Sequence, residues 1–292
     1  MGAAPQAAAA DRYAEWRDAK LARYPRSAAE LLVEVRDPRR LSPAERAAIA
    51  DRLRRANMAV YAAAPGDAAD KEIPRALGAQ FGLARLDPNW LADDDGISSI
   101  AVREGETRGE FIPYTDRAIR WHTDGYYNPP ERRIRAFVLH CVQSAAAGGE
   151  TQVMDHELAY ALVRDANPDW AEALMRPDAM TIPARGEGEG VQRAAQSGPV
   201  FSFDPADGAL HMRYTARTVS IRWADDPDVA GAAACLARML GEDTPHAFRL
   251  RLEPGMGIVC NNVLHARAAF RDAPERPRLL YRARYYDRCR TD

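Results

Sequence analysis

The pattern of hydrophobic and polar positions changes along the chain. Before residue 97 it predicts strands over 30–38 and 58–63 and helices over 42–57 and 68–81. After residue 97, short apolar or alternating runs separated by turn residues predict a long series of strands. These strands are expected over 97–102, 118–124, 134–142, 151–155, 179–184, 199–203, 209–214, 247–253, 257–262 and 279–286, with helices interrupting at about 155–176 and 226–240.

Three local signals sharpen this pattern. Ser42 is placed to cap the helix that follows it, Pro43 suits the first helical position, and Glu45 completes a capping box. The segment DPADG (204–208) separates two predicted strands and supplies the residues of a hairpin turn. The polar, glycine-rich segment RGEGEGVQRAAQSG (185–198) predicts an irregular loop that is a candidate lid.

Many short strands with turn signals between them favour a sandwich or a barrel, and a jelly roll with helices packed outside fits best. The predicted fold class is therefore mainly β with α. The chain shows neither an internal repeat nor a sharp change in composition. We therefore expect a flexible N-terminal tail over 1–10 and a single domain over 11–292.

Composition narrows the class of protein. The 292 residues are 47% hydrophobic and 28% charged, which is typical of a soluble globular protein. The net charge of −2 argues against a nucleic-acid binder, and no apolar run approaches the ~20 residues of a membrane span. The N-terminus lacks the charged region of a signal peptide, and the four cysteines are widely spaced without a CxxC pair. We expect a cytoplasmic protein with a small-molecule substrate; a homo-oligomer is also compatible with this composition.

The triplet His122-Thr123-Asp124 is the first candidate for chemistry. If 118–124 is extended, side chains two residues apart leave the same face, so His122 and Asp124 point together and Thr123 points away. An imidazole, a carboxylate and a second imidazole on one face of a metal leave three positions open, which suits non-haem Fe(II) oxygenases. An ordinary polar loop is the alternative, because H-x-D triplets are frequent by chance.

A third ligand must come from the other five histidines. His140 is expected to be a packed strand residue, and His156 begins a predicted helix that the preceding aspartate caps. His246 lies near a strand start and is expected to be exposed. His211 is a rival, since it sits in the middle of a predicted strand. His265 is preferred, because it follows a predicted strand at an end where ligands can reach the mouth of a barrel.

Four motifs occur in order: WHTDGYY at 121–127, GGET at 148–151, NNVLHARAAF at 261–270 and RPRLLYR at 276–282. Together they resemble the taurine dioxygenase family over about residues 30 to 287. The resemblance implies a double-stranded β-helix (jelly-roll) core with flanking helices. It also implies a dioxygenase that uses Fe(II), 2-oxoglutarate and O2 and that releases succinate and CO2.

The resemblance also implies roles for particular residues. His122, Asp124 and His265 match the positions that bind iron. Thr151, at the end of the GGET motif, matches a residue that contacts the distal carboxylate of 2-oxoglutarate. Arg278 matches the arginine that forms a salt bridge with the same carboxylate. The presence of Asp124 favours hydroxylation over halogenation, because related halogenases lack this carboxylate.

The strand 278–286 fits this assignment. One face would carry only apolar side chains and pack, whereas the other would carry three arginines, whose burial without partners is too unfavourable for an ordinary core. That face either meets solvent or lines a pocket for anions, and with the motifs in place we favour the pocket. The arginine-bearing face consists of Arg278, Leu280, Arg282 and Arg284, and the apolar face of Leu279, Tyr281, Ala283 and Tyr285.

Substrate recognition is predicted from fewer residues. Gly125 takes the position after the metal aspartate, and Tyr126 and Tyr127 either line the mouth of the pocket or pack. Arg282, as the second arginine of its motif, and Arg213 favour an anionic substrate, although Arg213 could equally be a surface strand residue. A carboxylate, sulfonate, amino acid or acidic sugar is expected, and a hydroxylase of the sugar acid Kdo is one candidate.

Two other classes remain open at the level of sequence. A zinc hydrolase could use the same triad, although the chain has no H-E-x-x-H signature. A non-catalytic jelly-roll binder of sugars or acids is the other alternative. Binding by such a protein should survive His122→Ala, whereas an oxygenase should lose metal and activity together.

Overall fold

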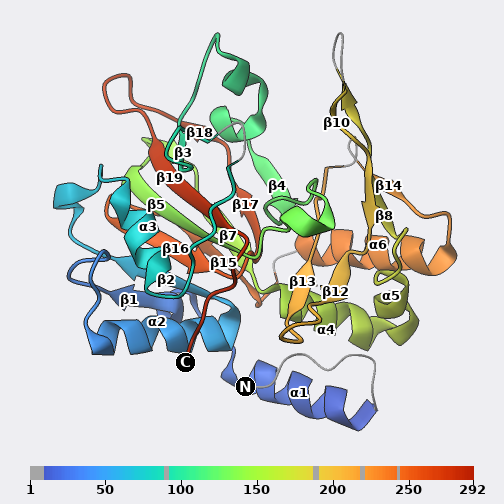
Figure 1. The fold of residues 1–292 in the computed structure, drawn as a ribbon. Coiled ribbons are helices and arrows are strands. Elements are labelled where there is room, and N and C mark those ends of the chain that lie inside the picture. The colour runs from blue at the N-terminus through green and yellow to red at the C-terminus, as the bar shows by residue number, and fades with distance from the viewer. Residues whose placement is uncertain (1–9, 89–91, 187–190, 218–220, 242–243) are drawn as a thin grey trace. The chain divides into compact units, whose positions relative to one another are not determined.

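The computed structural model describes residues 10–88, 92–186, 191–217, 221–241 and 244–292 (Figure 1). The chain forms two compact units. The first consists of α1 (Ala10–Arg23) with Arg120–Arg133 and Met154–Ala247, and the second of Tyr24–Ile119, Ile134–Val153 and Phe248–Asp292. The single domain over 11–292 stays a prediction. Residues 1–9 of the predicted tail lie outside the described residues, and Ala10 begins α1.

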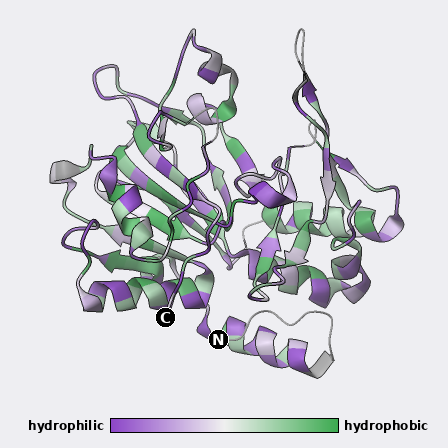
Figure 2. Ribbon diagram, in the orientation of Figure 1, coloured by the Kyte–Doolittle hydropathy of each residue, from purple (hydrophilic) through white to green (hydrophobic). Residues whose placement is uncertain are grey.

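A six-stranded sheet dominates the second unit, in the order β1-β2-β16-β5-β19-β3. β1 and β2 are parallel, and the other neighbouring pairs are antiparallel. Figure 2 shows hydrophobic residues along these strands, which is the composition expected where a sheet is covered. The strands are β1 (Leu32–Glu34), β2 (Met58–Ala62), β3 (Ser98–Ile100), β5 (Ala136–Gln143), β16 (Met256–Cys260) and β19 (Leu279–Tyr285).

The helix α2 (Pro43–Ala56) confirms its sequence signals. The Ser42 side chain accepts a hydrogen bond from the Glu45 backbone N–H, and the Glu45 carboxylate accepts one from the Ser42 N–H. The helix ends at Asn57, whose left-handed φ of 56° suits a C-cap. Hydrogen bonds therefore satisfy backbone groups at both ends of the helix, which fixes where it begins and where it ends.

The core of the second unit lies between the six-stranded sheet and two helices, α2 and α3 (Glu72–Ala79). Fully burying each large apolar side chain stabilises the fold by about 1.5–3 kcal/mol. The predicted apolar face of 279–285 lies in this core, which confirms that assignment. Buried members include Ile49, Leu53 and Leu77 of the helices and Tyr61, Val138, Val259, Tyr281, Ala283 and Tyr285 of the sheet.

Shorter strands complete the second unit. β15 (Ala247–Leu250), β7 (Thr151–Met154) and β17 (Leu264–Arg267) are successive neighbours in another sheet. β6 (Ala147–Gly148) pairs with β18 (Phe270–Arg271) in antiparallel register. β4 (Ile119–His122) carries the chain from the second unit into the first.

The first unit combines helices with small sheets. One sheet has the order β11-β8-β14, and two antiparallel hairpins are formed by β9 with β10 and by β12 with β13. Within the described residues, no helix is long and apolar enough to cross a membrane. The elements are α4 (His156–Ala166), α5 (Pro168–Ala173), α6 (Pro227–Gly241), β8 (Met180–Ile182), β9 (Arg185–Gly186), β10 (Val191–Arg193), β11 (Gln196–Gly198), β12 (Phe201–Phe203), β13 (Leu210–Met212) and β14 (Arg222–Trp223).

Three predictions can be judged in this unit. The hairpin turn at 204–208 is confirmed, since Phe203 pairs with Leu210 across it. The irregular loop over 185–198 is wrong, because most of its described residues form β9, β10 and β11, whose backbone pairing does not depend on side-chain polarity. The single helix over 155–176 is also wrong. Asn167 is extended before Pro168, as a residue before proline prefers, and it caps a second helix.

Candidate functional site

The segment with His122 and Asp124 lies in the first unit. The expectation that 118–124 is extended throughout is wrong, because β4 ends at His122 and Asp124 begins a turn. Gly125 has a φ of 68°, and its carbonyl accepts a hydrogen bond from the Asn128 N–H at 2.8 Å, which closes the turn. The two predicted ligands nevertheless face each other, with His122 Nε2 3.9 Å from Asp124 Oδ1.

Thr123 anchors this turn from inside the protein. It is fully buried, its N–H donates to the Tyr214 carbonyl at 3.0 Å, and its Oγ1 accepts from the Tyr214 N–H at 3.1 Å. The neighbouring Asp124 carboxylate is also buried, at 5% exposure. A buried carboxylate needs nearby positive charge, which a metal ion can supply.

Both predicted imidazole ligands have the same ring orientation relative to their own backbone. His122 Nδ1 lies 2.9 Å from the Arg120 carbonyl oxygen, and His265 Nδ1 lies 3.0 Å from the Val263 carbonyl oxygen. A carbonyl only accepts, so Nδ1 carries the proton in each ring and Nε2 carries the lone pair. This is the tautomer in which Nε2 can bind a metal while the backbone fixes the ring.

His265 belongs to the second unit and lies inside β17. The expectation that it follows the end of a strand is therefore incomplete, because the chain begins another strand at Leu264. The His265 ring lies 4.8 Å from the Phe137 ring, measured between centroids, at an interplanar angle of 55°. Strand and ring contact together restrict the orientation of this imidazole.

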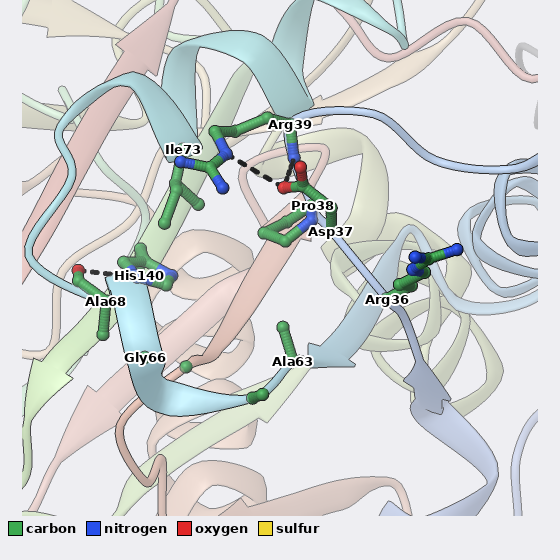
Figure 3. Close-up of a pocket in the computed structure, with 11 residues that line it drawn as sticks. Arg36, Asp37, Pro38, Arg39, Ala63, Gly66, Ala68, Ile73 and His140 are labelled. Carbon is green, nitrogen blue, oxygen red and sulfur yellow. Dashed lines mark hydrogen bonds and ion pairs between the residues drawn. The ribbon is translucent and has the colours of Figure 1, made fainter.

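His140 confirms the prediction of a packed strand residue. It is fully buried on β5, with Nδ1 2.8 Å from the Tyr61 hydroxyl and Nε2 3.0 Å from the Ala68 carbonyl. Burial lowers the pKa of His140 to about 4, so the ring is neutral near pH 7. Figure 3 shows it beside Ala68 on the wall of a pocket that is also lined by the Asp37–Arg39 ion pair. This pocket has a volume of about 310 Å³.

His156 confirms the second structural assignment. The preceding residue, Asp155, accepts a hydrogen bond from the Glu157 N–H and caps α4. The His156 Nε2 lies 3.0 Å from the Leu210 carbonyl oxygen, which makes Nε2 the protonated nitrogen. Helix capping and packing against β13 therefore explain this histidine.

The GGET motif lies in the second unit, where its glycines meet conformational demands. Gly148 has a φ of 73°, and a Cβ there would lie 2.2 Å from the Ala269 carbonyl oxygen. Gly149 has a φ of 75°, and a Cβ there would approach Arg278 Nε to 3.5 Å. The pair leaves space beside the Arg278 guanidinium. Thr151, the first residue of β7, is buried at 5% exposure.

Arg278 is a buried cation that forms no direct ion pair with a carboxylate among the described residues, and the effect of Asp272 on it is smaller than that of burial. Its exposure is 5%, its Nη1 is buried without a hydrogen bond, and its guanidinium lies 5.0 Å from the Phe270 ring centroid. Burial lowers the pKa of Arg278 to about 10. Arg267 lies over the same ring at 4.8 Å but donates to the carbonyls of Thr115, at 2.7 Å, and Pro113, at 3.2 Å. Arg278 is thus the guanidinium of this pair that can take an anionic ligand.

The remaining arginines of β19 are held differently. Arg284 forms a buried ion pair with Asp87, which also accepts a hydrogen bond from the Tyr286 hydroxyl at 2.6 Å. This internal pair explains Arg284 without an anion pocket, which corrects that part of the prediction. Arg282 is partly buried and pairs with Ser98 of β3 in the sheet register.

The residues predicted to recognise substrate lie around the turn after β4. The Tyr126 ring is edge-on to the His122 ring at 6.4 Å and to the Tyr127 ring at 5.1 Å, between centroids. Arg213 lies one residue beyond β13, and its guanidinium donates to the carbonyl oxygens of Tyr126 at 3.3 Å and Gly198 at 2.7 Å. It therefore ties the turn to β11, and a direct role in binding substrate stays a prediction.

Arg193 was missed by the sequence reasoning. It lies at the end of β10, and its guanidinium stands 5.3 Å from the centroid of the Tyr127 ring. The polar, glycine-rich segment around it indicated a loop and gave no reason to single out this arginine.

Comparison with known proteins agrees with this arrangement. A sequence model of the family described as "Taurine catabolism dioxygenase TauD, TfdA family" matches residues 18–284. A uridine-5'-phosphate dioxygenase from Amycolatopsis sp. is 32% identical over 207 residues, which are 63% of this chain and 72% of the relative.

Solved structures agree in fold. A taurine dioxygenase from Burkholderia xenovorans superimposes with a TM-score of 0.58 at 20% identity, over 90% of this chain and 89% of the other. An asparagine oxygenase solved with Fe(II), 2S,3S-3-hydroxyasparagine and succinate gives a TM-score of 0.57 at 16% identity, over 83% and 79%. These likenesses confirm the predicted fold class, mainly β with α around a jelly-roll core.

The family match covers nearly the whole chain, and it accounts for the four sequence motifs together. The predicted cofactors, Fe(II) with 2-oxoglutarate and O2 as cosubstrates, are those of this family. The chain therefore belongs to the taurine catabolism dioxygenase TauD, TfdA family, and it is a 2-oxoglutarate-dependent dioxygenase.

Proposed function

We propose that this dioxygenase hydroxylates a small anionic substrate and that a nucleoside 5'-phosphate such as uridine-5'-phosphate is the first candidate. The observation that carries this choice is the similarity to the uridine-5'-phosphate dioxygenase. A phosphate ester extends the anionic classes inferred from the sequence, which were carboxylates, sulfonates, amino acids and acidic sugars such as Kdo. The family match favours this oxygenase over the zinc hydrolase and the non-catalytic binder.

We infer that His122, Asp124 and His265 hold the Fe(II). Among the described residues, these three form a group of potential ligands that could hold a metal ion, and each offers one ligand atom. Two imidazoles and one carboxylate are the donor set of non-haem Fe(II) oxygenases. The backbone hydrogen bonds at His122 and His265 support the assignment, because they leave Nε2 as the coordinating nitrogen. The iron supplies the oxidising chemistry when bound, and the protein supplies orientation and a dry environment.

We infer that Arg278 and Thr151 bind the distal carboxylate of 2-oxoglutarate. A carboxylate fits a guanidinium well, because two parallel N–H···O bonds can form. Support comes from the burial of Arg278 without a direct ion pair among the described residues and from the space that Gly149 leaves beside its Nε. Burial also strengthens the attraction, since screening by water is reduced.

On the substrate side we infer roles for Gly125, Tyr126, Arg282 and Arg213. The Gly125 backbone can approach a ligand closely, because no side chain intervenes. Tyr126 offers an aromatic surface beside His122. Arg213 contributes through the turn, since it holds the Tyr126 carbonyl. Arg282 is the candidate for direct contact with substrate charge.

The test measures succinate formed from 2-oxoglutarate in the presence of Fe(II), ascorbate and a panel of uridine-5'-phosphate, uridine, Kdo, taurine and asparagine. We expect uridine-5'-phosphate to be hydroxylated and succinate to form in proportion to it. Succinate that never exceeds the substrate-free rate with any anion would overturn the proposal.

A second measurement tests the proposed metal ligands independently of the substrate. In anaerobic titrations, His122→Ala and His265→Ala should lose the visible charge-transfer band of Fe(II) with 2-oxoglutarate. His211→Ala is the matched control, since His211 was the rival third ligand. Loss of the band in His211→Ala with retention in His265→Ala would show that the ligand set is wrong.

A further inference from the structure

Arg193 is a half-buried cation with little internal compensation. Its Nη2 donates to the Pro183 carbonyl at 2.9 Å, and its Nε is buried without a hydrogen-bond partner. A guanidinium has five N–H donors, so this single contact leaves most of them for other acceptors. Within the described part of the chain, Arg193 forms no ion pair with a carboxylate.

Two other arginines of the first unit have protein partners for their guanidinium donors. The Arg213 guanidinium donates to several backbone carbonyls, which include that of Gly198 at 2.7 Å. Arg176 forms ion pairs with Asp178 at 3.0 Å and Asp226 at 2.6 Å. A structural role therefore accounts for Arg176 and Arg213, because protein groups accept their hydrogen bonds. Arg193 has only one such contact among the described residues, so a structural role does not account for its partial burial.

A second cation lies on the strand that pairs with the strand of Arg193. Arg185 is the register partner of Arg193 across the β9–β10 hairpin. Desolvation and this second guanidinium lower the pKa of Arg193, whereas the neighbouring tyrosines partly offset the shift. Two cations on facing strands repel each other, so this neighbour disfavours the charged form of Arg193.

Arg193 is connected to the metal-binding turn through aromatic contacts. Its guanidinium stacks near the Tyr127 ring, which contacts the Tyr126 ring, which in turn contacts the His122 ring. All four residues belong to the first unit. The Arg193 guanidinium is thus linked to His122 through the rings of Tyr127 and Tyr126.

We propose that Arg193 binds the anionic group of the substrate, a phosphate monoester if the substrate is a nucleotide, while Tyr126 and Tyr127 line the path from that group to the metal. This inference rests on the proposed function and names the residue that recognises the charge. A guanidinium suits a phosphate because its fork donates two parallel hydrogen bonds. Arg193 belongs to the first unit, whereas Arg278, which we assign to 2-oxoglutarate, belongs to the second.

The experiment compares wild type, Arg193→Gln and Arg193→Lys with uridine-5'-phosphate and with uridine. Arg193→Gln should lower kcat/KM for the phosphate about 10- to 100-fold, mainly through KM, because it removes charge-assisted hydrogen bonds. Turnover of uridine should change less than about twofold, so the preference for phosphate should collapse. The kcat/KM of Arg193→Lys for the phosphate should lie between those of wild type and Arg193→Gln, since lysine keeps the charge but lacks the planar fork of the guanidinium.

Two controls guard against a folding defect. Arg222→Gln changes an exposed arginine on β14 of the same unit and should behave as wild type. The charge-transfer band of Fe(II) with 2-oxoglutarate should be unchanged in Arg193→Gln. If Arg193→Gln loses this band, its fold is damaged, and the kinetic comparison is then made between wild type and Arg193→Lys.

The outcomes test the role of Arg193 separately from the proposed function. If wild type oxidises uridine-5'-phosphate and Arg193→Gln does so with unchanged kcat/KM, the role of Arg193 is wrong and the proposed function stands. A proportional loss for phosphate and uridine alike would also overturn it, since charge recognition affects only the phosphate. If wild type oxidises no phosphate ester, the nucleotide proposal and the role of Arg193 in it both fall.

Discussion

Replacement of Arg278 by methionine should stabilise the protein without ligands and at the same time abolish its stabilisation by 2-oxoglutarate. The lowering of the Arg278 pKa to about 10 corresponds to an unfavourable free energy of about 3 kcal/mol for the charged, folded form. The contact with Phe270 returns about 1–2 kcal/mol of this. Arg278→Met should therefore raise the free energy of unfolding of the metal-free protein by about 1–2 kcal/mol, or Tm by about 2–4 °C.

The ligand-bound protein should show the opposite effect. Loss of two charge-assisted hydrogen bonds to a buried carboxylate removes about 3 kcal/mol or more of binding free energy, so Kd for 2-oxoglutarate should rise more than about 100-fold. At a ligand concentration of about 100 times the wild-type Kd, wild type gains about 2.7 kcal/mol of stability, and the variant should gain almost none. Thermal unfolding with and without Fe(II) and 2-oxoglutarate under anaerobic conditions measures both effects.

Arg284→Met is the matched control from the same stretch of chain. Asp87 is fully buried and pairs with Arg284, so removal of this arginine leaves an uncompensated carboxylate and should cost about 3–5 kcal/mol. The two substitutions are chemically identical and should move stability in opposite directions. A metal-free Arg278→Met protein destabilised as much as Arg284→Met would refute the claim that Arg278 awaits an external anion.

Three further predictions concern separate parts of the molecule. His122→Ala and His265→Ala should each weaken Fe(II) binding at least about 10-fold while leaving the far-UV circular dichroism spectrum unchanged; metal titration checks this, and full retention of binding would contradict it. Lys20→Met should destabilise the protein by about 3–5 kcal/mol, because Lys20 is buried in an ion pair with Asp155 at 2.6 Å; urea unfolding measures this, and a neutral result would show that the pair is dispensable. Because the folded-state pKa of His140 is lowered to about 4 from an ordinary value near 6.5, the unfolded chain binds more protons between these values. Stability should therefore fall by up to about 3 kcal/mol as pH drops from 6.5 through 4, and a His140→Asn variant should lack that part of the pH dependence.

Much of the fold could be read from local patterns. The capping box at Ser42 fixed the start of α2 to the residue, and alternation located most of the long strands. The errors occurred where long-range pairing decides the structure. The segment 185–198 carries no strand-like side-chain pattern, yet β11 pairs with β8 through backbone hydrogen bonds alone. The predicted helix over 155–176 overlooked the constraint that Pro168 places on Asn167.

The candidate site was predicted unevenly for a related reason. Motif order selects His122, Asp124 and His265 as the proposed metal ligands, because these residues sit in short sequence contexts. The same reasoning could not tell which arginines are compensated. Arg284 and Arg278 look alike in the sequence, but the first forms an ion pair with the buried Asp87, whereas the second forms no direct ion pair among the described residues. Asp87 is 197 residues from Arg284 along the chain, and no local pattern reveals such a partner.

The arginines of this protein can therefore be sorted by what satisfies their donors, and the sorting carries functional information. A carboxylate neutralises one group, as at Arg284, and backbone carbonyls accept several hydrogen bonds from a second, as at Arg267 and Arg213. Carbonyls satisfy hydrogen bonds but carry no net charge. Within the described part of the chain, neither Arg278 nor Arg193 forms an ion pair, and Arg193 donates to a single backbone carbonyl. A fold that shelters two such cations gains stability when anions bind. Under the proposed function these cations have different ligands, 2-oxoglutarate at Arg278 and the anionic group of the substrate at Arg193.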